Sequence, residues 1–255
     1  MDIAAQITDL TVDIAVRGGR AAPVVRVLDG ADLALPAGDV TALIGESGCG
    51  KSLVALALCG LLPASSRISG RITIGDDDMS AAGERAWRQL RGRRIGLVPQ
   101  SAATSFTPVR TVGSQVAEVC RRVNADRTAE QLFAAVRLPG DVGDRYPHEL
   151  SGGMAQRAAI AAALAGRPEL LIADEPTSAL DPDNAATVWG LLAEAAADGA
   201  AVLVITHDLA SLLAADACGQ VALMRDGAVL RQGPVVDLLD GHDEYAARFF
   251  DRVPA

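Results

Sequence analysis

The stretch VTALIGESGCGKS, residues 40–52, decides the fold. Residues 40–45 form a mainly apolar run that ends in glycine, which is typical of a strand buried on both faces of a parallel sheet. Residues 45–52 match the pattern G-x-x-x-x-G-K-[ST], and the run SLVALALCGLL predicts a helix directly after it. A strand, a glycine-rich loop and a helix in this order predict a phosphate-binding loop, because backbone N–H groups and the helix N-terminus then face one anion.

Each part of this loop has a predicted task in nucleotide binding. Glycines let the backbone curl around the phosphates, the lysine reaches the β- and γ-phosphates, and the serine hydroxyl is a predicted Mg²⁺ ligand. The predicted contacts are Gly45, Glu46, Ser47, Gly48, Cys49, Gly50, Lys51 and Ser52. Chance would produce this pattern roughly once in a thousand chains of such composition.

Lys51 is the only lysine among 23 basic residues. A GC-rich codon bias accounts for the arginines elsewhere. The loop, however, is shaped around a compact charge that a planar guanidinium does not replace. The lone lysine therefore marks the predicted nucleotide site.

Net charge and hydropathy exclude several classes of protein. The net charge of −9 argues against binding to nucleic acid or anionic lipid by overall charge, although it allows a local basic patch. The longest uncharged apolar stretch, residues 54–62, is far shorter than the roughly 20 residues of a membrane-spanning helix. The N-terminus lacks a signal-peptide pattern, and the four widely spaced cysteines predict reduced thiols rather than disulfides or a zinc site.

The remaining segments predict the architecture, and 255 residues suit one large domain or two closely integrated ones. Residues 1–40 alternate apolar and polar positions around a glycine-rich turn, which predicts an antiparallel hairpin. Residues 101–149 have helical patterns and predict a helical insert. LLIAD and AVLVIT, each preceded by a predicted helix, continue the parallel sheet, and VALMRDGAVLRQG predicts a hairpin at Asp226-Gly227. Residues 76–78, three aspartates, favour a solvated turn over a metal site.

Two strand ends carry predicted catalytic groups. Asp174 and Glu175 end the strand LLIAD, and His207 follows the next one. Ligands of parallel sheets bind beyond the carboxyl ends of the strands, so these side chains should emerge beside the phosphate loop. We expect Asp174 to hold Mg²⁺, Glu175 to orient or deprotonate the attacking water, and His207 to hold Glu175 or that water in line.

The segment LSGGMAQR, residues 150–157, identifies the family. It resembles the signature sequence of ATP-binding cassette (ABC) transporter ATPases, and the other elements follow in the family's order. Gln100 matches the Q-loop, residues 178–181 the D-loop and His207 the switch histidine. The resemblance implies an α/β fold with a P-loop NTPase (RecA-like) core, an N-terminal antiparallel β-subdomain and an inserted helical subdomain. The implied cassette spans residues 5–235, with its helical subdomain at about 101–149, and residues 236–255 are a predicted helical tail.

The resemblance also implies a two-chain site. Two cassettes dimerise head to tail, so that each ATP lies between one phosphate loop and the other chain's signature. Ser151 is a natural helix N-cap, and the two glycines after it expose N–H groups to a γ-phosphate. Gln100 would join Mg²⁺ to the helical insert and assist catalysis. The implied nucleotide contacts in the signature and the D-loop are Ser151, Gly152, Gly153, Gln156 and Asp181.

Three further segments resemble the ATPase subunits of oligopeptide, dipeptide and nickel importers: QSAATSFTPVRTVGSQVAE, RYPHELSGGMAQR and LIADEPTSALD. This narrower resemblance implies two membrane permease subunits, a second cassette of identical or paralogous sequence, an extracytoplasmic binding protein, and a peripheral position on the cytoplasmic face of the membrane. The sequence ends at residue 255 without the cysteine-rich extension of many peptide importers. We therefore lean slightly toward nickel or metallophore cargo, and the cargo stays open.

One departure from the family concerns adenine. Most cassettes stack the base on an aromatic residue upstream of the phosphate loop, whereas the first aromatic residue here is Trp87. Residues 16–27 offer only aliphatic contact or the plane of Arg26. We therefore predict weak discrimination between purines.

Three other functions compete with import. A soluble cassette ATPase of DNA repair or translation would normally carry coiled coils, zinc modules or two cassettes, and this sequence has none of them. A P-loop kinase or GTPase leaves LSGGMAQR unexplained. An ABC exporter is disfavoured only by the residues after Gln100, and import itself rests on analogy.

Overall fold

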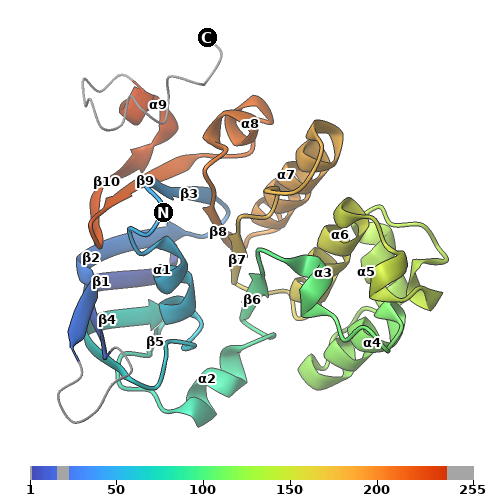
Figure 1. Ribbon diagram of the computed structural model, residues 1–255, viewed down its shortest axis with the longest axis horizontal. Helices are drawn as coiled ribbons and strands as arrows, with labels where there is room; N and C mark the ends of the chain where they lie inside the picture. The colour runs from blue at the N-terminus through green and yellow to red at the C-terminus, as the bar shows by residue number, and fades with distance from the viewer. Residues whose placement is uncertain (1, 16–22, 240–255) are drawn as a thin grey trace.

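The computed structural model describes residues 2–15 and 23–239, which form two sheets and the helices around them (Figure 1). The larger sheet has the order β10-β9-β3-β8-β7-β6. Its strands are β3 (Val40–Gly45), β6 (Ile95–Val98), β7 (Leu170–Asp174), β8 (Ala201–Ile205), β9 (Gln220–Arg225) and β10 (Ala228–Pro234). All neighbours are parallel except β9 and β10, which form the predicted hairpin at Asp226-Gly227.

The smaller sheet is antiparallel and has the order β2-β1-β4-β5. It consists of β1 (Ile3–Ala15), β2 (Val24–Pro36), β4 (Ser66–Ile74) and β5 (Asp77–Asp78). The predicted N-terminal hairpin is thus confirmed, although most of its turn lies outside the described residues. Asp77 pairs with Arg94 and Asp78 with Arg71, so both aspartates of β5 have a cation beside them.

Nine α-helices lie in the described part of the chain. They are α1 (Lys51–Leu58), α2 (Glu84–Leu90), α3 (Ala102–Ser105), α4 (Val112–Val123), α5 (Ala129–Ala135), α6 (Gly152–Ala163), α7 (Pro182–Ala197), α8 (Leu209–Ala214) and α9 (Val235–Leu239). α1 ends four residues earlier than the apolar run predicts. Gly60 has a φ of +61°, and the ring of Trp87 occupies the place of a Cβ there, so the chain must leave the helix.

The larger sheet is buried on both faces, and its strands alternate between two cores. In β8, Val202 and Val204 face a core shared with α6 and α7, whereas Leu203 and Ile205 face a core shared with α1 and the antiparallel sheet. Figure 1 shows the same layering, with α1 and the small sheet on one side of β6–β8 and α6 and α7 on the other. This two-sided burial explains why the parallel strands read as continuous apolar runs.

Helices α3, α4 and α5 pack on α6 and form a helical region beside the sheet (Figure 1). The predicted limits of this region and of the cassette stay predictions. Residues 240–255 of the predicted tail lie outside the described part, and residues 236–239 belong to α9. All four cysteines are free of disulfide bonds. Within residues 2–15 and 23–239, no helix is both long and apolar enough to cross a membrane.

Candidate functional site

The carboxyl ends of four parallel strands meet at one edge of the larger sheet. The strands lie in the order β3-β8-β7-β6, and they lead into the phosphate loop, His207, the Asp174-Glu175 pair and Gln100 respectively. The register places Asp174 beside Ile205 and Ala173 beside Val98. The structure therefore brings together predicted residues that are as far apart in the sequence as Gly45 and His207.

The phosphate loop is held against the end of β9 by its glycines. A Cβ on Gly45 would lie 2.2 Å from the carbonyl oxygen of Met224, and the φ of Gly45 is +156°. The β9–β10 turn supports the loop from the same side, because the Gly227 N–H donates to the Cys49 carbonyl at 3.1 Å. A side chain on Gly45 would push the loop away from this support.

The loop itself is suited to an anion. α1 begins after Gly50, whose φ is +109°, and it has neither a side-chain cap nor an acidic residue in its first turn. Nothing lies within 4 Å of the position of a Cβ on Gly48, so this part of the loop is open. The first N–H groups of α1, those of Lys51 and Ser52, therefore remain for a phosphate, whereas the Leu53 N–H donates to the Gly50 carbonyl at 2.9 Å.

Lys51 lies over this loop. Its Nζ donates to the carbonyl oxygens of Gly45 and Glu46, at 2.8 Å in each case. These bonds fold the ammonium back over the loop, where a phosphate would meet both the charge and the backbone donors. The arrangement fits the β- and γ-phosphates that the sequence predicts for it.

Ser52 and Asp174 form the predicted metal pair. The Ser52 hydroxyl is hydrogen-bonded to the Asp174 carboxyl, and burial of Asp174 raises the pKa of this carboxyl, with the Glu175 charge adding to the effect. A serine hydroxyl and a carboxylate are the oxygen donors that Mg²⁺ prefers. The donor set thus fits Mg²⁺, and the two residues would hold it between loop and sheet.

Glu175 and His207 are in close polar contact, because His207 Nδ1 lies 2.7 Å from Glu175 Oε2. The Glu175 side chain is 16% exposed and that of His207 is 69% exposed, so the histidine is the outer member. Glu175 has a φ of +49°, and its N–H donates to the Ile205 carbonyl at 2.8 Å. Such a backbone costs about 1–3 kcal/mol and is found where the surrounding structure fixes a functional side chain.

Gln100 follows β6 at the same edge and is exposed. The residue before it, Pro99, lines a cavity between the sheet and the helical region. Gln100 is thus placed between the nucleotide edge and this cavity, as its predicted linking role requires.

The signature residues lie apart from this edge, at the start of α6. Ser151 caps the helix by accepting a hydrogen bond from the Met154 N–H at 3.2 Å, and both Ser151 and Gly152 are exposed. Gly153 is buried under α7, because a Cβ there would lie 2.5 Å from Asn184 Oδ1. Asp181 caps α7, and its carboxylate accepts hydrogen bonds from the backbone N–H and the side-chain amide of Asn184.

This contact between the signature and α7 is a feature that sequence reasoning missed. Two glycines in a row suggest a binding loop, but they do not show that the second one accommodates a side chain of α7.

Gln156 departs from the predicted arrangement. It is 5% exposed and lies inside α6, and its Nε2 has no hydrogen-bond partner among the described residues. Ser151 and Gly152 are thus exposed at the start of α6, whereas Gln156 is buried, and a nucleotide contact by Gln156 stays a prediction.

The adenine region is described only in part. Residues 16–22 lie outside the described residues, and Arg26 pairs with Asp13 and Asp29, at 3.0 Å in each case. The edge of the guanidinium is thus engaged by carboxylates, and the prediction of weak purine discrimination stays a prediction.

Comparison with known proteins identifies the family. The ABC transporter family model matches residues 28–178. A probable peptide ABC transporter ATP-binding protein of Sinorhizobium fredii is 40% identical over 84% of this chain and 67% of its own length. The oligopeptide transport ATP-binding protein of Mycobacterium tuberculosis is 38% identical over 98% of this chain, which spans only 42% of that protein.

The fold comparison agrees with the sequence comparison. A dimeric ATP-binding cassette in a post-hydrolysis state, bound to ADP and Pi, is 25% identical and superposes with a TM-score of 0.76 over 91% of this chain and 98% of its own. A nucleotide-free ATP-binding cassette from an ABC transporter superposes with a TM-score of 0.77 over 98% of this chain and 99% of its own. Its sequence is 21% identical, so this likeness supports the fold alone. The chain therefore belongs to the ABC transporter family, and it is an ATP-hydrolysing cassette with the predicted P-loop core.

Proposed function

We propose that the chain powers a peptide importer by hydrolysing ATP at the edge formed by β3, β8, β7 and β6. The observation that carries this proposal is the 2.7 Å contact between Glu175 and His207 beside the phosphate loop. Nucleotide binding alone does not need a base, whereas hydrolysis needs a base and a group that positions it. The printed names of the Sinorhizobium and Mycobacterium relatives favour peptides over nickel as cargo.

Each residue at this edge has its own role in the reaction. The phosphate loop binds the triphosphate, and the Lys51 ammonium, now on the loop carbonyls, turns to the β- and γ-phosphates. Glu175 accepts a proton from the attacking water, and the water oxygen then bonds to the γ-phosphorus as the bond from this phosphorus to the β,γ-bridging oxygen breaks, which releases phosphate and ADP. Ser52, Asp174 and Gln100 would hold Mg²⁺, which would supply positive charge to offset the negative charge that develops on the phosphates.

His207 positions this base. The Glu175 carboxylate is an acceptor, so Nδ1 of His207 carries the proton in their contact, and Nε2 of the neutral ring is then an acceptor. A neutral His207 can therefore hold a proton of the water, whereas only the imidazolium can donate to a phosphate oxygen.

We place the second half of the site on another cassette. Ser151 and Gly152 are exposed at the start of α6, away from the phosphate loop, so they are available to the nucleotide of a second chain. The dimeric cassette that resembles this chain supports such an arrangement. ATP would close the pair and hydrolysis would release it, and Asp181 would couple the two sites from the D-loop. The second cassette is an identical or a paralogous chain.

Two permease subunits and an extracytoplasmic binding protein complete the proposed importer at the cytoplasmic face of the membrane. An apolar cavity of about 460 Å³ supports a permease contact, because it opens between the sheet and the helical region next to Gln100. A docked permease helix there would sense the nucleotide through Gln100. Nickel import, a soluble cassette role and export are the alternatives, and none has its own structural observation.

Reconstitution tests this function. We expect the chain, its permeases, the second cassette and the binding protein to take up a labelled oligopeptide into vesicles with ATP on the cassette side. Glu175→Gln should stop uptake while ATP binding persists. ATP-driven uptake of nickel but not of peptides would contradict the cargo, and hydrolysis unaffected by permeases and binding protein would contradict the importer.

A further inference from the structure

A hollow lined by arginines lies next to the apolar cavity. Its lining residues are Arg85, Arg88, Gln89, Arg91, Arg93, Arg122 and Val123, and its volume is about 550 Å³. No described aspartate or glutamate lines it. A concentration of five arginines in a chain with a net charge of −9 is the local basic patch that the overall charge allows.

Two of these arginines have no side-chain partner among the described residues. Arg88 and Arg91 pair with Glu84, and Arg122 pairs with Glu118. The guanidinium groups of Arg85 and Arg93 are exposed and make no ion pair or hydrogen bond with a described residue. Their positive charges are therefore available to an external anion.

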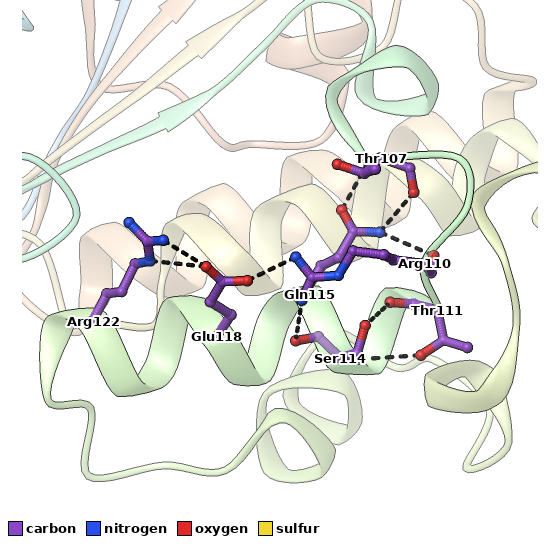
Figure 2. Close-up of polar contacts among 7 residues, drawn as sticks. All are labelled: Thr107, Arg110, Thr111, Ser114, Gln115, Glu118 and Arg122. Atoms are coloured by element: carbon purple, nitrogen blue, oxygen red, sulfur yellow. Dashed lines mark hydrogen bonds and ion pairs between the residues drawn. The ribbon is translucent and has the colours of Figure 1, made fainter.

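The hollow and the cavity form one continuous surface, because Arg91 and Arg122 line both. Figure 2 shows how α4 builds the shared wall: Glu118 binds Arg110 at 2.7 Å on one side and Arg122 at 2.6 Å on the other. These pairs fix the long side chains along α4. An occupant of the cavity would thus meet apolar side chains in its centre and arginines at one end.

The rim of the cavity is fixed as well. Gln115 accepts from the Thr107 N–H at 2.8 Å and donates to the carbonyls of Thr107 and Arg110, which ties the segment before α4 to this helix (Figure 2). A rim held in this way costs little conformational entropy on binding. The rim is therefore held in place by hydrogen bonds within the chain.

We propose that the arginine-lined hollow binds an acidic side chain on the permease helix that docks in the apolar cavity, and so determines which permease the cassette accepts. This inference rests on the proposed permease partnership. The cavity is concave and apolar, so a helix can insert side chains into it, whereas a flat lipid surface cannot. An aspartate or glutamate at the end of that helix would reach Arg85 and Arg93.

Cross-linking tests the contact directly. Lys51 is the only lysine of the wild-type chain, so Arg93→Lys adds one amine at the hollow, and a carbodiimide joins this amine to a touching carboxyl group as an amide. In the assembled transporter we expect an adduct between position 93 and an aspartate or glutamate of a permease. Arg231→Lys, on exposed β10, is the matched control and should give none. Adducts only within the cassette, or equal adducts from both variants, would overturn the proposal.

Binding measurements separate this inference from the function on which it rests. Arg93→Glu should bind the permease pair in nanodiscs about tenfold more weakly than wild type at low salt. The difference should shrink at 1 M salt, where the Debye length is about 3 Å. Arg231→Glu should bind like wild type, and the isolated variants should keep their basal ATPase activity.

Each other outcome has a definite meaning. If wild type does not bind the permeases, both the importer function and this inference fail. If wild type and Arg93→Glu bind equally, the inference alone fails. If wild type but not Arg93→Glu binds vesicles of phosphatidylcholine with 30% phosphatidylglycerol in the absence of permeases, the hollow binds lipid phosphate and the proposal is wrong.

Discussion

Replacing Gly153 with alanine should destabilise the chain, whereas the same change at Gly152 should not. A Cβ on Gly153 would lie 2.5 Å from Asn184 Oδ1, 2.7 Å from its Cγ and 3.2 Å from its Cβ. A Cβ on Gly152 would meet only Leu180 Cδ2 at 3.8 Å and the Ala179 carbonyl oxygen at 3.9 Å. The two neighbouring glycines thus differ in the space around them, although both belong to the signature.

The magnitude follows from the contacts of Asn184. Its side chain can turn away from the new methyl group only by breaking its 2.7 Å hydrogen bond to Asp181, which is worth about 0.5–1.5 kcal/mol. The 3.2 Å contact with the Asn184 Cβ would remain, and overpacking costs about 1–3 kcal/mol. We expect Gly153→Ala to lower the free energy of unfolding by about 1–3 kcal/mol, less any gain in helix propensity, which is at most about 1 kcal/mol.

Urea unfolding of a double-mutant cycle tests this reasoning. Asn184→Ala removes the two closest atoms, so the double variant should be at least about 1 kcal/mol more stable than the sum of the single effects predicts. Gly152→Ala should be neutral or slightly stabilising. Additive effects in the cycle, or equal losses at both glycines, would refute the claim that Asn184 imposes the glycine.

Three further predictions concern the nucleotide site. Burial raises the pKa of Asp174, so this carboxyl contributes stability at low pH that is lost as the pH rises through the raised pKa. Asp174→Asn should therefore raise the Tm at pH 8, and the difference in Tm from wild type should shrink as the pH is lowered. The same variant should lose Mg²⁺-dependent hydrolysis. A Tm below that of wild type at pH 8 would contradict this. Lys51→Arg should lose tight ATP binding in calorimetry as Lys51→Ala does, since a guanidinium does not fit the two loop carbonyls, and retained affinity would show that charge alone suffices. GTP should displace fluorescent ATP from this chain more readily than from a cassette that has an aromatic residue upstream of its phosphate loop. Equal or poorer displacement would contradict the predicted weak discrimination between purines.

Local sequence patterns were enough to predict every strand of the larger sheet except β6. Strands such as β8 are buried on both faces and therefore appear as apolar runs, and each predicted carboxyl end carries its polar residue directly afterwards. The positions of Lys51, Asp174, Glu175 and His207 follow from this pattern and from the parallel order.

Features that depend on contacts between distant segments were not predictable. Nothing near Gly153 in the sequence shows that Asn184 lies above it, and nothing near Gln156 shows that its amide is buried. The arginine-lined hollow joins α2, the turn after it and the end of α4. The RGRR run at residues 91–94 is visible in the sequence, but which of its charges lack partners depends on tertiary contacts.

The central claim is that ATP bound at one phosphate loop is completed by the signature of a second cassette. The most direct test is the mass of Glu175→Gln with ATP and Mg²⁺, measured by light scattering after gel filtration, alone and mixed with the second cassette that copurifies with its permeases. We predict a species of two cassettes, twice the 26.2 kDa of one chain for an identical pair, which separates with ADP and does not form when Ser151→Arg is added. A single-chain mass both alone and in the mixture, with nucleotide tightly bound, would contradict the two-chain site.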